Sequence, residues 1–298
     1  MSWIFFAFLA PFLWAGCNVL DKFLLSKKFK NAFSYQVWIA SMIIFPIVLL
    51  PIFFKISFNY PIFIFGIVIG IIDLISFFIY NKAMLIEEAS RVIPLSYLNS
   101  IFVLPLSFIF LGETLTPIKY IAVLILMSGS ILISYKGMEK KKRVFSPAIK
   151  FIILIAFFWA SMAVAEKYIL NFIDPISLLY SMIIGFFIGG IISLISKKIR
   201  KNYFEMIKIV DKKIFVLTIL NIFLSYSAFF LFFNAISIGF VSLVVGISSI
   251  QPFIVFFYMT LLTLFFPEII KEKIDKSTIL LKLIAICFIF IGSYLIVS

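Results

Sequence analysis

The stretch WAGCNVLDKFLL at residues 14–25 recurs as WASMAVAEKYIL at residues 159–170. Each copy carries a tryptophan and a small residue, then a valine, an acid–lysine pair, an aromatic residue and two aliphatic residues. The copies begin 145 residues apart in a chain of 298 residues. Self-similarity at such an offset indicates a duplicated unit, the alternative being chance similarity between two Leu-, Ile- and Phe-rich segments.

A second set of matches runs through the two halves at an offset of 152 residues. The matched positions are polar residues and short motifs inside otherwise apolar stretches. They pair Ser90, Ser96 and Asn99 with Ser242, Ser248 and Gln251, and Asn81-Lys82-Ala83 with Phe233-Asn234-Ala235. Separately, Leu111-Gly112-Glu113 has a looser counterpart in Phe266-Pro267-Glu268.

The composition is that of a chain solvated by lipid. Hydrophobic residues make up 64% of the sequence and charged residues only 13%. A soluble domain carries about 25% charged residues, so this chain cannot cover a water-facing surface. Apolar stretches long enough to cross a bilayer occur at ten places. They are residues 3–25, 33–54, 61–85, 90–111, 117–135, 148–170, 176–196, 214–237, 241–265 and 278–297.

These stretches predict an all-α integral membrane protein with ten transmembrane helices. Open sheets leave unpaired edges in lipid, and the apolar runs do not alternate as barrel strands do. We expect residues 1–135 to form a first five-helix repeat, 136–147 a basic loop and 148–298 a second five-helix repeat. Because five is odd, the second repeat must cross the membrane in the opposite sense, a common build for secondary transporters.

The chain is basic, with 26 Lys and Arg against 13 Asp and Glu and a net charge of +13. Most of these cations lie in short clusters between apolar stretches, a pattern typical of cytoplasmic loops rather than of nucleic-acid binding. They fall on the side opposite the N-terminus, so the charge bias places both termini outside the cell. We therefore expect a multi-pass protein of the plasma membrane that is surrounded by lipid and binds no nucleic acid.

Several kinds of site are excluded by missing residue types. The chain has no His and only two Cys, which lie in separate apolar stretches. A disulfide framework, a zinc or haem site and a catalytic His base are therefore not expected. The chain also has no Gly-rich phosphate loop, so we expect no ATP-driven pumping. We predict no catalytic residues, no metal and no cofactor.

The chain resembles the drug/metabolite transporter superfamily, in its ten-helix EamA-type branch. The resemblance rests on the first-helix motif that begins at Trp14, its repeat at Trp159, the Leu111-Gly112-Glu113 end of the fourth helix, and Gly129 in the fifth. It implies export of amino acids, nucleosides, drugs or other metabolites. Family members commonly keep both termini in the cytoplasm, which is opposite to the orientation that the charges of this chain favour.

Ionisable groups inside the bilayer are the first candidates for a site, because each is costly to place there. Trp14, Asn18, Asp21 and Lys22 share one helix face by their spacing, and Trp159, Glu166 and Lys167 mark the equivalent face in the second half. The lysines are candidates for holding a carboxylate or phosphate, and the acids for fixed partners or proton sites. The alternative for each lysine is snorkelling to the interface.

Further candidates lie near the middle of the spans. Asp73 is the deepest carboxylate and a candidate for proton coupling, the alternative being a structural hydrogen bond. Asn99 and Gln251, with Ser96 and Ser248, and Tyr97 are candidates for contacts to a polar substrate, although amides also hold helices together. Glu113 is expected to support the turn into the next helix.

These observations favour a secondary transporter that exports small polar or amphipathic metabolites by alternating access. Helices three, four, eight and nine are expected to rock against the rest in a monomer or homodimer, and proton coupling is a candidate property of the transport. The alternatives are a lipid-linked sugar flippase, an intramembrane lipid-modifying enzyme and a non-transporting subunit.

Overall fold

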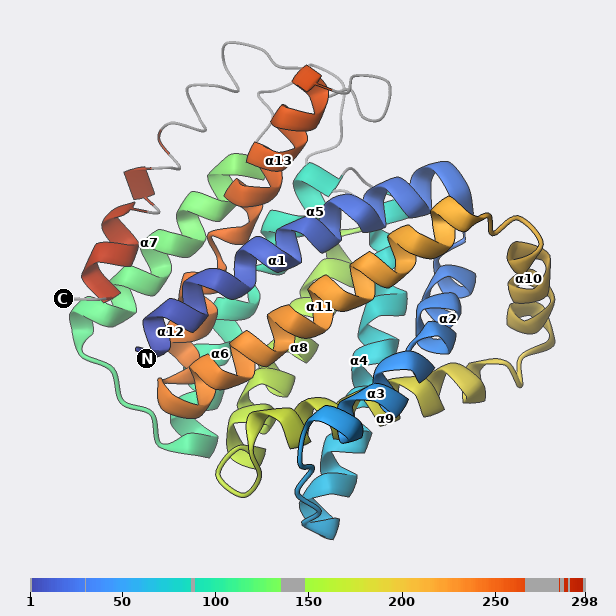
Figure 1. Ribbon diagram of the computed structural model, residues 1–298. Helices are drawn as coiled ribbons and strands as arrows, with labels where there is room; N and C mark the ends of the chain where they lie inside the picture. The colour runs from blue at the N-terminus through green and yellow to red at the C-terminus, as the bar shows by residue number, and fades with distance from the viewer. Residues whose placement is uncertain are drawn as a thin grey trace.

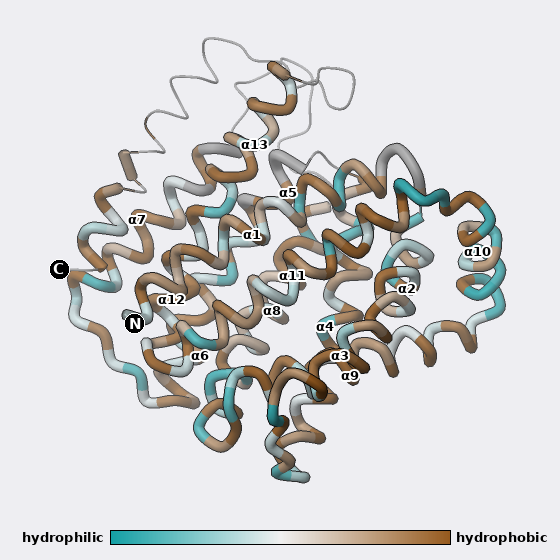
Figure 2. Tube along the Cα trace, in the orientation of Figure 1, coloured by the Kyte–Doolittle hydropathy of each residue, from teal (hydrophilic) through white to brown (hydrophobic). Residues whose placement is uncertain are grey.

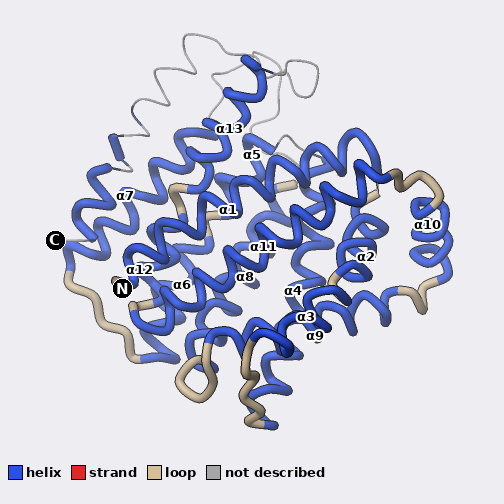
Figure 3. The backbone as a smooth tube through the Cα atoms, viewed as in Figure 1, coloured by secondary structure: helices blue, strands red, loops and turns tan. Residues whose placement is uncertain are grey.

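The structure is a computed structural model that describes residues 2–29, 31–86, 89–134 and 148–265, and residues 284, 287, 288 and 290–296 near the C-terminus. Every regular element in these ranges is helical, and none is a strand (Figure 3). Seven helical segments of the described residues are long and apolar enough to cross a membrane, and two of them, Ala32–Phe53 and Val241–Phe265, are each made of two consecutive helices. The all-α membrane class is therefore confirmed. Half of the tenth expected span, residues 278–297, lies outside the described residues, so the count of ten stays a prediction.

The helices follow one another with short links (Figure 1). In the first half they are α1 (Trp3–Phe23), the π-helix η1 (Leu24–Phe29), α2 (Ala32–Met42), α3 (Ile44–Phe53), α4 (Tyr60–Ile86), α5 (Ala89–Ser96), α6 (Asn99–Leu111) and α7 (Pro117–Ser134). In the second half they are α8 (Ile149–Ile169), α9 (Pro175–Ser193), α10 (Lys197–Ile207), α11 (Lys212–Ile238), α12 (Val241–Ser248) and α13 (Gln251–Phe265).

Three of the expected spans are each divided into two helices. The breaks lie at Ile43, at residues 97–98 and at residues 249–250. Pro46 and Pro252 follow two of these breaks closely, and a proline removes one helical hydrogen bond and clashes with the carbonyl four residues earlier. In lipid such freed backbone groups are tolerated only where protein or a cavity surrounds them.

The segment expected as a polar link after residue 196 contains a helix, α10, which packs on α2. Its buried side chains, Tyr203 and Met206, are one turn apart, and Lys197, Lys198 and Lys201 are exposed. The helix is therefore amphipathic. Figure 2 shows its hydrophilic residues as a teal group at the right edge. The sequence prediction missed α10 because charged residues outnumber the apolar residues of its buried stripe.

Small residues bring α4 and α9 into close contact. Gly66 and Gly70 of α4 are four residues apart, as are Gly185 and Gly189 of α9. A Cβ atom at Gly70 would overlap the backbone carbonyl of Met182, and one at Gly185 would overlap that of Ile67. Such pairs of small residues are a common basis of helix contacts in membranes, where dispersion forces between closely packed backbones replace the hydrophobic effect.

Helices from the two halves pack mainly on one another. The most extensive contacts join α1 to α11, α4 to α9 and α6 to α8. The outer surface carries large apolar side chains such as Phe53, Phe110 and Phe223, each about two-thirds exposed or more. A soluble monomer does not expose so many large apolar side chains, whereas lipid solvates them.

We expect Gly70→Ala to destabilise the protein by roughly 1–3 kcal/mol, because the added methyl group forces α4 away from α9. Gly16→Ala in α1 is the matched control, since its Cβ would meet only a flexible Leu224 side chain at 3.4 Å. Thermal unfolding in detergent measures both variants. Equal unfolding midpoints for the two would contradict this account of the α4–α9 contact.

Asp174 begins α9 and shows why the chain turns there. Its carboxylate accepts hydrogen bonds from the backbone N–H of Ser177 at 3.0 Å, from the Ser177 hydroxyl at 2.7 Å and from the Ser57 hydroxyl at 3.0 Å. Pro175 at the first helical position fits this start, because its missing N–H would have no partner there. Partial burial alone would raise the pKa of Asp174, but these hydrogen bonds outweigh it and lower the pKa below its usual 3.8.

A carboxyl group with a lowered pKa stabilises the fold above its unfolded pKa and loses that contribution as the pH falls. We therefore expect the wild type to lose stability below pH 3.8, its ordinary pKa, relative to Asp174→Asn, which keeps an acceptor but does not ionise. Thermal unfolding of both proteins across about pH 3–6 tests this. A difference between them that stays constant over that range would contradict it.

Candidate functional site

A buried cavity of about 170 Å³ lies between the two halves of the chain. Its walls come from α1, α2, α4, α6, α8, α9, α11, α12 and α13. Nine of the eleven site residues expected from the sequence line it. They are Trp14, Asn18, Asp21, Asp73, Tyr97, Asn99, Trp159, Glu166 and Gln251.

A chain of hydrogen bonds crosses the cavity wall and joins four segments. Tyr97, in the link between α5 and α6, donates its hydroxyl to Gln251 of α13. The Gln251 amide donates in turn to Asn18 Oδ1 of α1 at 2.5 Å, and Asn18 Nδ2 donates to the Tyr80 hydroxyl of α4 at 3.1 Å. Two helix breaks, at residues 97–98 and 249–250, place Tyr97 and Gln251 where they meet. The polar residues of both halves thus form one network.

Asp21 lies at one end of the cavity with two donors of its own. The Tyr35 hydroxyl donates to Asp21 Oδ1 at 2.6 Å, and Asn221 Nδ2 donates to the same oxygen at 2.7 Å. Tyr35 is on α2 and Asn221 on α11, so three helices converge on this carboxylate. Two donors on one carboxylate favour a fixed orientation of its side chain.

Asp73 and Glu166 differ from Asp21 in having no donor. Both side chains are buried, with 5% and 3% of their surface exposed. Within the described residues neither accepts a hydrogen bond. Both line the cavity, although they are 93 residues apart in the sequence.

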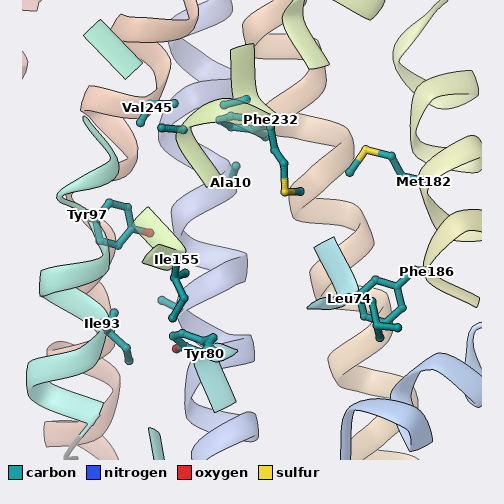
Figure 4. Close-up of a cluster of buried hydrophobic side chains, with 14 of the residues drawn as sticks. Ala10, Leu74, Tyr80, Ile93, Tyr97, Ile155, Met182, Phe186, Phe232 and Val245 are labelled. Atoms are coloured by element: carbon teal, nitrogen blue, oxygen red, sulfur yellow. The ribbon is translucent and has the colours of Figure 1, made fainter. Parts of the chain in front are cut away.

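Aromatic rings form much of the remaining wall. Trp14 packs against Phe229 with ring centroids 5.3 Å apart, and Trp159 packs against Tyr80 at 5.5 Å. Figure 4 shows Tyr80, Tyr97, Phe186 and Phe232, from four different segments, within the buried cluster around the cavity. Both tryptophans of the repeated motif therefore pack against an aromatic ring of the wall.

The two lysines of the repeat motif, Lys22 and Lys167, are not among the residues that line the cavity. The Lys167 ammonium donates to the backbone carbonyls of Ile236 at 2.6 Å, Ser237 at 3.3 Å and Gly239 at 3.2 Å. These carbonyls belong to the C-terminal end of α11, whose last carbonyls have no partner within the helix. The structure therefore gives Lys167 a capping role at the end of α11, and its expected contact with an anion stays a prediction.

Glu113 binds the other end of the link between α11 and α12, where α12 begins. Gly112 adopts φ = +67°, which ends α6 and directs the next residue away. The Glu113 carboxylate then accepts from the backbone N–H groups of Val241 at 2.7 Å and Ser242 at 3.2 Å, and from the Ser242 hydroxyl at 2.6 Å. Glu113 thus caps α12 from the link that follows α6. The expectation that it supports the turn into the next helix, α7, is corrected. A cation at the end of α11 and an anion at the start of α12 both match the helix dipoles.

Tyr35, Tyr80 and Asn221 were missed by the sequence analysis. Asn221 is an amide inside the apolar stretch 214–237, a signal that points to a cavity or a helix contact. The tyrosines gave no comparable signal, because tyrosine is common at membrane interfaces and in apolar cores.

An apolar groove adjoins the cavity on the outer side of α11. It has a volume of about 520 Å³ and lies among α3, α9 and α11. Ile222 and Tyr226 line both the groove and the cavity. The wall between these two spaces is therefore thin.

We expect Lys167→Met to lower the stability of the protein by roughly 1–3 kcal/mol, because three carbonyls at the end of α11 lose their donor. Glu113→Gln should act in the same direction through α12. Lys201→Met is the control, since its pair with Glu205 is exposed and 3.9 Å long and contributes little. Denaturant unfolding in detergent compares the three. A Lys167→Met protein as stable as the control would contradict the capping role.

Comparison with known proteins agrees with this architecture. A solved crystal structure, described simply as that of a protein, is similar to this chain with a TM-score of 0.68 at 15% identity, over 98% of this chain and 94% of its own. At that identity the likeness shows a shared fold alone. No curated protein matches the sequence. The EamA-like transporter family matches residues 1–135. The first 135 residues are therefore similar to this transporter family, and the seven candidate spans make the chain a multi-pass integral membrane protein.

Proposed function

We propose that this protein is a secondary transporter that exports small polar or amphipathic metabolites, such as amino acids, by alternating access through the central cavity. The observation that supports it most is a buried, partly polar cavity whose walls come from both halves of the chain. A cavity between pseudo-equivalent halves is where secondary transporters hold their substrates.

The proposed inverted repeat is supported by the lengths of equivalent helices. The helices α4 and α11 both have 27 residues, α5 and α12 both have 8, and each pair is offset by 152 residues. The breaks before α6 and α13 follow the same offset. The cavity residues also occur in repeat-related pairs. They are Trp14 and Trp159, Cys17 and Met162, Asn18 and Ala163, Asp21 and Glu166, Asp73 and Ser225, Phe77 and Phe229, Tyr80 and Phe232, and Asn99 and Gln251.

Helix packing supports a particular pair of moving groups. One group contains α4, α6, α8 and α9, and the other contains α1, α11 and α13, with the closest contacts inside each group. This grouping differs from the one expected from the sequence, because α4 and α11 fall on opposite sides. Each group contains helices of both halves, and the repeat exchanges α8 with α1, α4 with α11 and α6 with α13. Rocking of the two groups about the cavity would open it to one side at a time.

Proton coupling is part of the proposal. Asp73 and Glu166 are buried carboxyl groups without a donor among the described residues, and Asp21 has two. A carboxyl group in a site that alternately meets two solutions is able to carry a proton from one to the other. The proposed proton sites are therefore Asp73, Glu166 and Asp21.

A lipid-linked sugar flippase is the second candidate. The apolar groove beside α11 favours it, because a lipid tail requires a path from the bilayer to the headgroup site. The small volume of the cavity favours the metabolite transporter, since a sugar headgroup needs more room.

Transport by purified protein in liposomes tests the proposal. We expect labelled amino acids or other small metabolites to accumulate under a pH gradient and the accumulation to stop when the gradient is collapsed. Fluorescent lipid-linked sugars in the same vesicles test the flippase. Absence of flux for every small metabolite, with lipid movement present, would replace the first candidate by the second.

Gln251→Leu should reduce transport about tenfold, because it cuts the hydrogen-bond chain from Tyr97 to Asn18 and leaves buried polar atoms unpaired. Ser128→Ala is the matched control, since its hydroxyl donates to the Leu124 carbonyl within α7. Initial rates in liposomes, corrected for the amount of folded protein, provide the measurement. Equal rates for the two variants would remove this network from the transport path.

A further inference from the structure

The segment between α9 and α11 carries a concentrated positive charge. Residues 197–213 contain seven Lys and Arg against two acids. All seven cations are exposed, and they are Lys197, Lys198, Arg200, Lys201, Lys208, Lys212 and Lys213. Figure 1 shows α10 at the right edge, beside the ends of α9 and α11. Because these two helices are both candidate membrane spans, the segment that joins them lies at one boundary of the bilayer.

The segment does not neutralise this charge itself. The Asp211 carboxylate accepts the backbone N–H of Ile214 at 2.7 Å and so caps α11. Glu205 pairs with Lys201 at 3.9 Å, and within the described residues none of the other six cations forms an ion pair. Two lysines also stand in the first turn of α10, where the helix dipole disfavours cations. The positive charge is therefore available to an anion from outside the chain.

An exposed aromatic ring lies among these cations. Tyr203 and Met206 are buried, and α10 packs on α2, so the helix is held in place. Phe204 is 56% exposed, and by its spacing it shares a face with Lys197 and Lys201. Water solvates the lysines but not the phenylalanine ring, whereas the boundary between headgroups and acyl chains solvates both. This face therefore fits a lipid surface better than it fits water.

We propose that α10 is a binding surface for anionic phospholipids, with its cations on the headgroup phosphates and Phe204 among the upper parts of the acyl chains. Basic segments beside a membrane are attracted by the negative potential of an anionic leaflet. A zwitterionic lipid offers the same phosphate beside an ammonium group, so it carries no net charge and binds more weakly. None of residues 197–213 lines the central cavity, so this surface does not depend on the transport proposal.

A fluorescent reporter on α10 tests the lipid contact locally. Phe204→Trp places an indole on the exposed face, and bromine atoms on acyl chains quench indole fluorescence only at short range. The full-length variant is reconstituted in vesicles of phosphatidylglycerol and phosphatidylcholine with the same acyl chains, and one or the other lipid is brominated. Wild-type protein in the same vesicles gives the signal of the other tryptophans, which is subtracted. We expect brominated phosphatidylglycerol to quench at least about threefold more per molecule than brominated phosphatidylcholine.

The two lipids and the salt concentration give outcomes that decide the matter. Equal quenching by both lipids would overturn the proposal. Quenching by neither would place α10 in water and leave its basic face to an acidic macromolecule, which also overturns it. Raising NaCl to about 0.5 M should remove the preference for phosphatidylglycerol, because salt screens exposed charges. A preference that salt does not change would contradict the ionic contact.

Charge variants assign the preference to α10. Lys197→Gln with Arg200→Gln, added to the reporter protein, should lower the quenching ratio by at least about half. Lys55→Gln with Lys119→Gln is the matched control, because it removes the same charge from the link after α3 and from α7 and should leave the ratio unchanged. Both α10 side chains are exposed, so the unfolding midpoint in detergent should stay the same. A preference that survives in the α10 pair, or falls equally in the control pair, would overturn the assignment.

Discussion

Hydrocarbon offers no hydrogen bonds, so every interruption of a helix in this protein must be satisfied by another part of the chain. The two-residue link between α11 and α12 shows the constraint most clearly. Lys167 supplies donors for the carbonyls that end α11, and Glu113 supplies acceptors for the N–H groups that begin α12. The charges of these two residues would be costly in lipid, and here they replace backbone partners that water would otherwise provide. Their roles are structural for that reason.

The same constraint places the cavity where it is. The breaks at residues 97–98 and 249–250 bring Tyr97 and Gln251 to one point, and the residues around them line the cavity. The close contact of α4 with α9 positions Asp73 on a helix that the glycines hold firmly against its neighbour. The close packing of α4 on α9 at Gly70 thus fixes one wall of the site. Polar side chains meet at the breaks between helices.

Much of this arrangement was predictable from the sequence, and the exceptions have physical reasons. Long apolar stretches predict the spans, and the motifs at Trp14 and Trp159 predict which faces turn inward, because helical spacing fixes which residues share a face. Periodicity says nothing about what a long side chain reaches, so it does not predict that Lys167 caps the end of α11. The capping of α12 by Glu113 was not predictable for the same reason, since its partner Val241 is 128 residues away. Tyr35 and Asn221 required knowledge of which helices surround Asp21.

The repeat-related pairs around the cavity bear on the resting state of the protein. In the proposed inverted repeat, the inward- and outward-facing shapes exchange the parts played by the two halves, so identical halves would give two shapes of equal free energy. The pairs are not identical, since Asp73 corresponds to Ser225 and Asn18 to Ala163. Each unlike pair therefore biases the population of one shape over the other, and a bias of about 1.4 kcal/mol corresponds to a ratio of ten to one. Under the proposed transport function, divergence between the two copies thus makes one of the two shapes the favoured resting state.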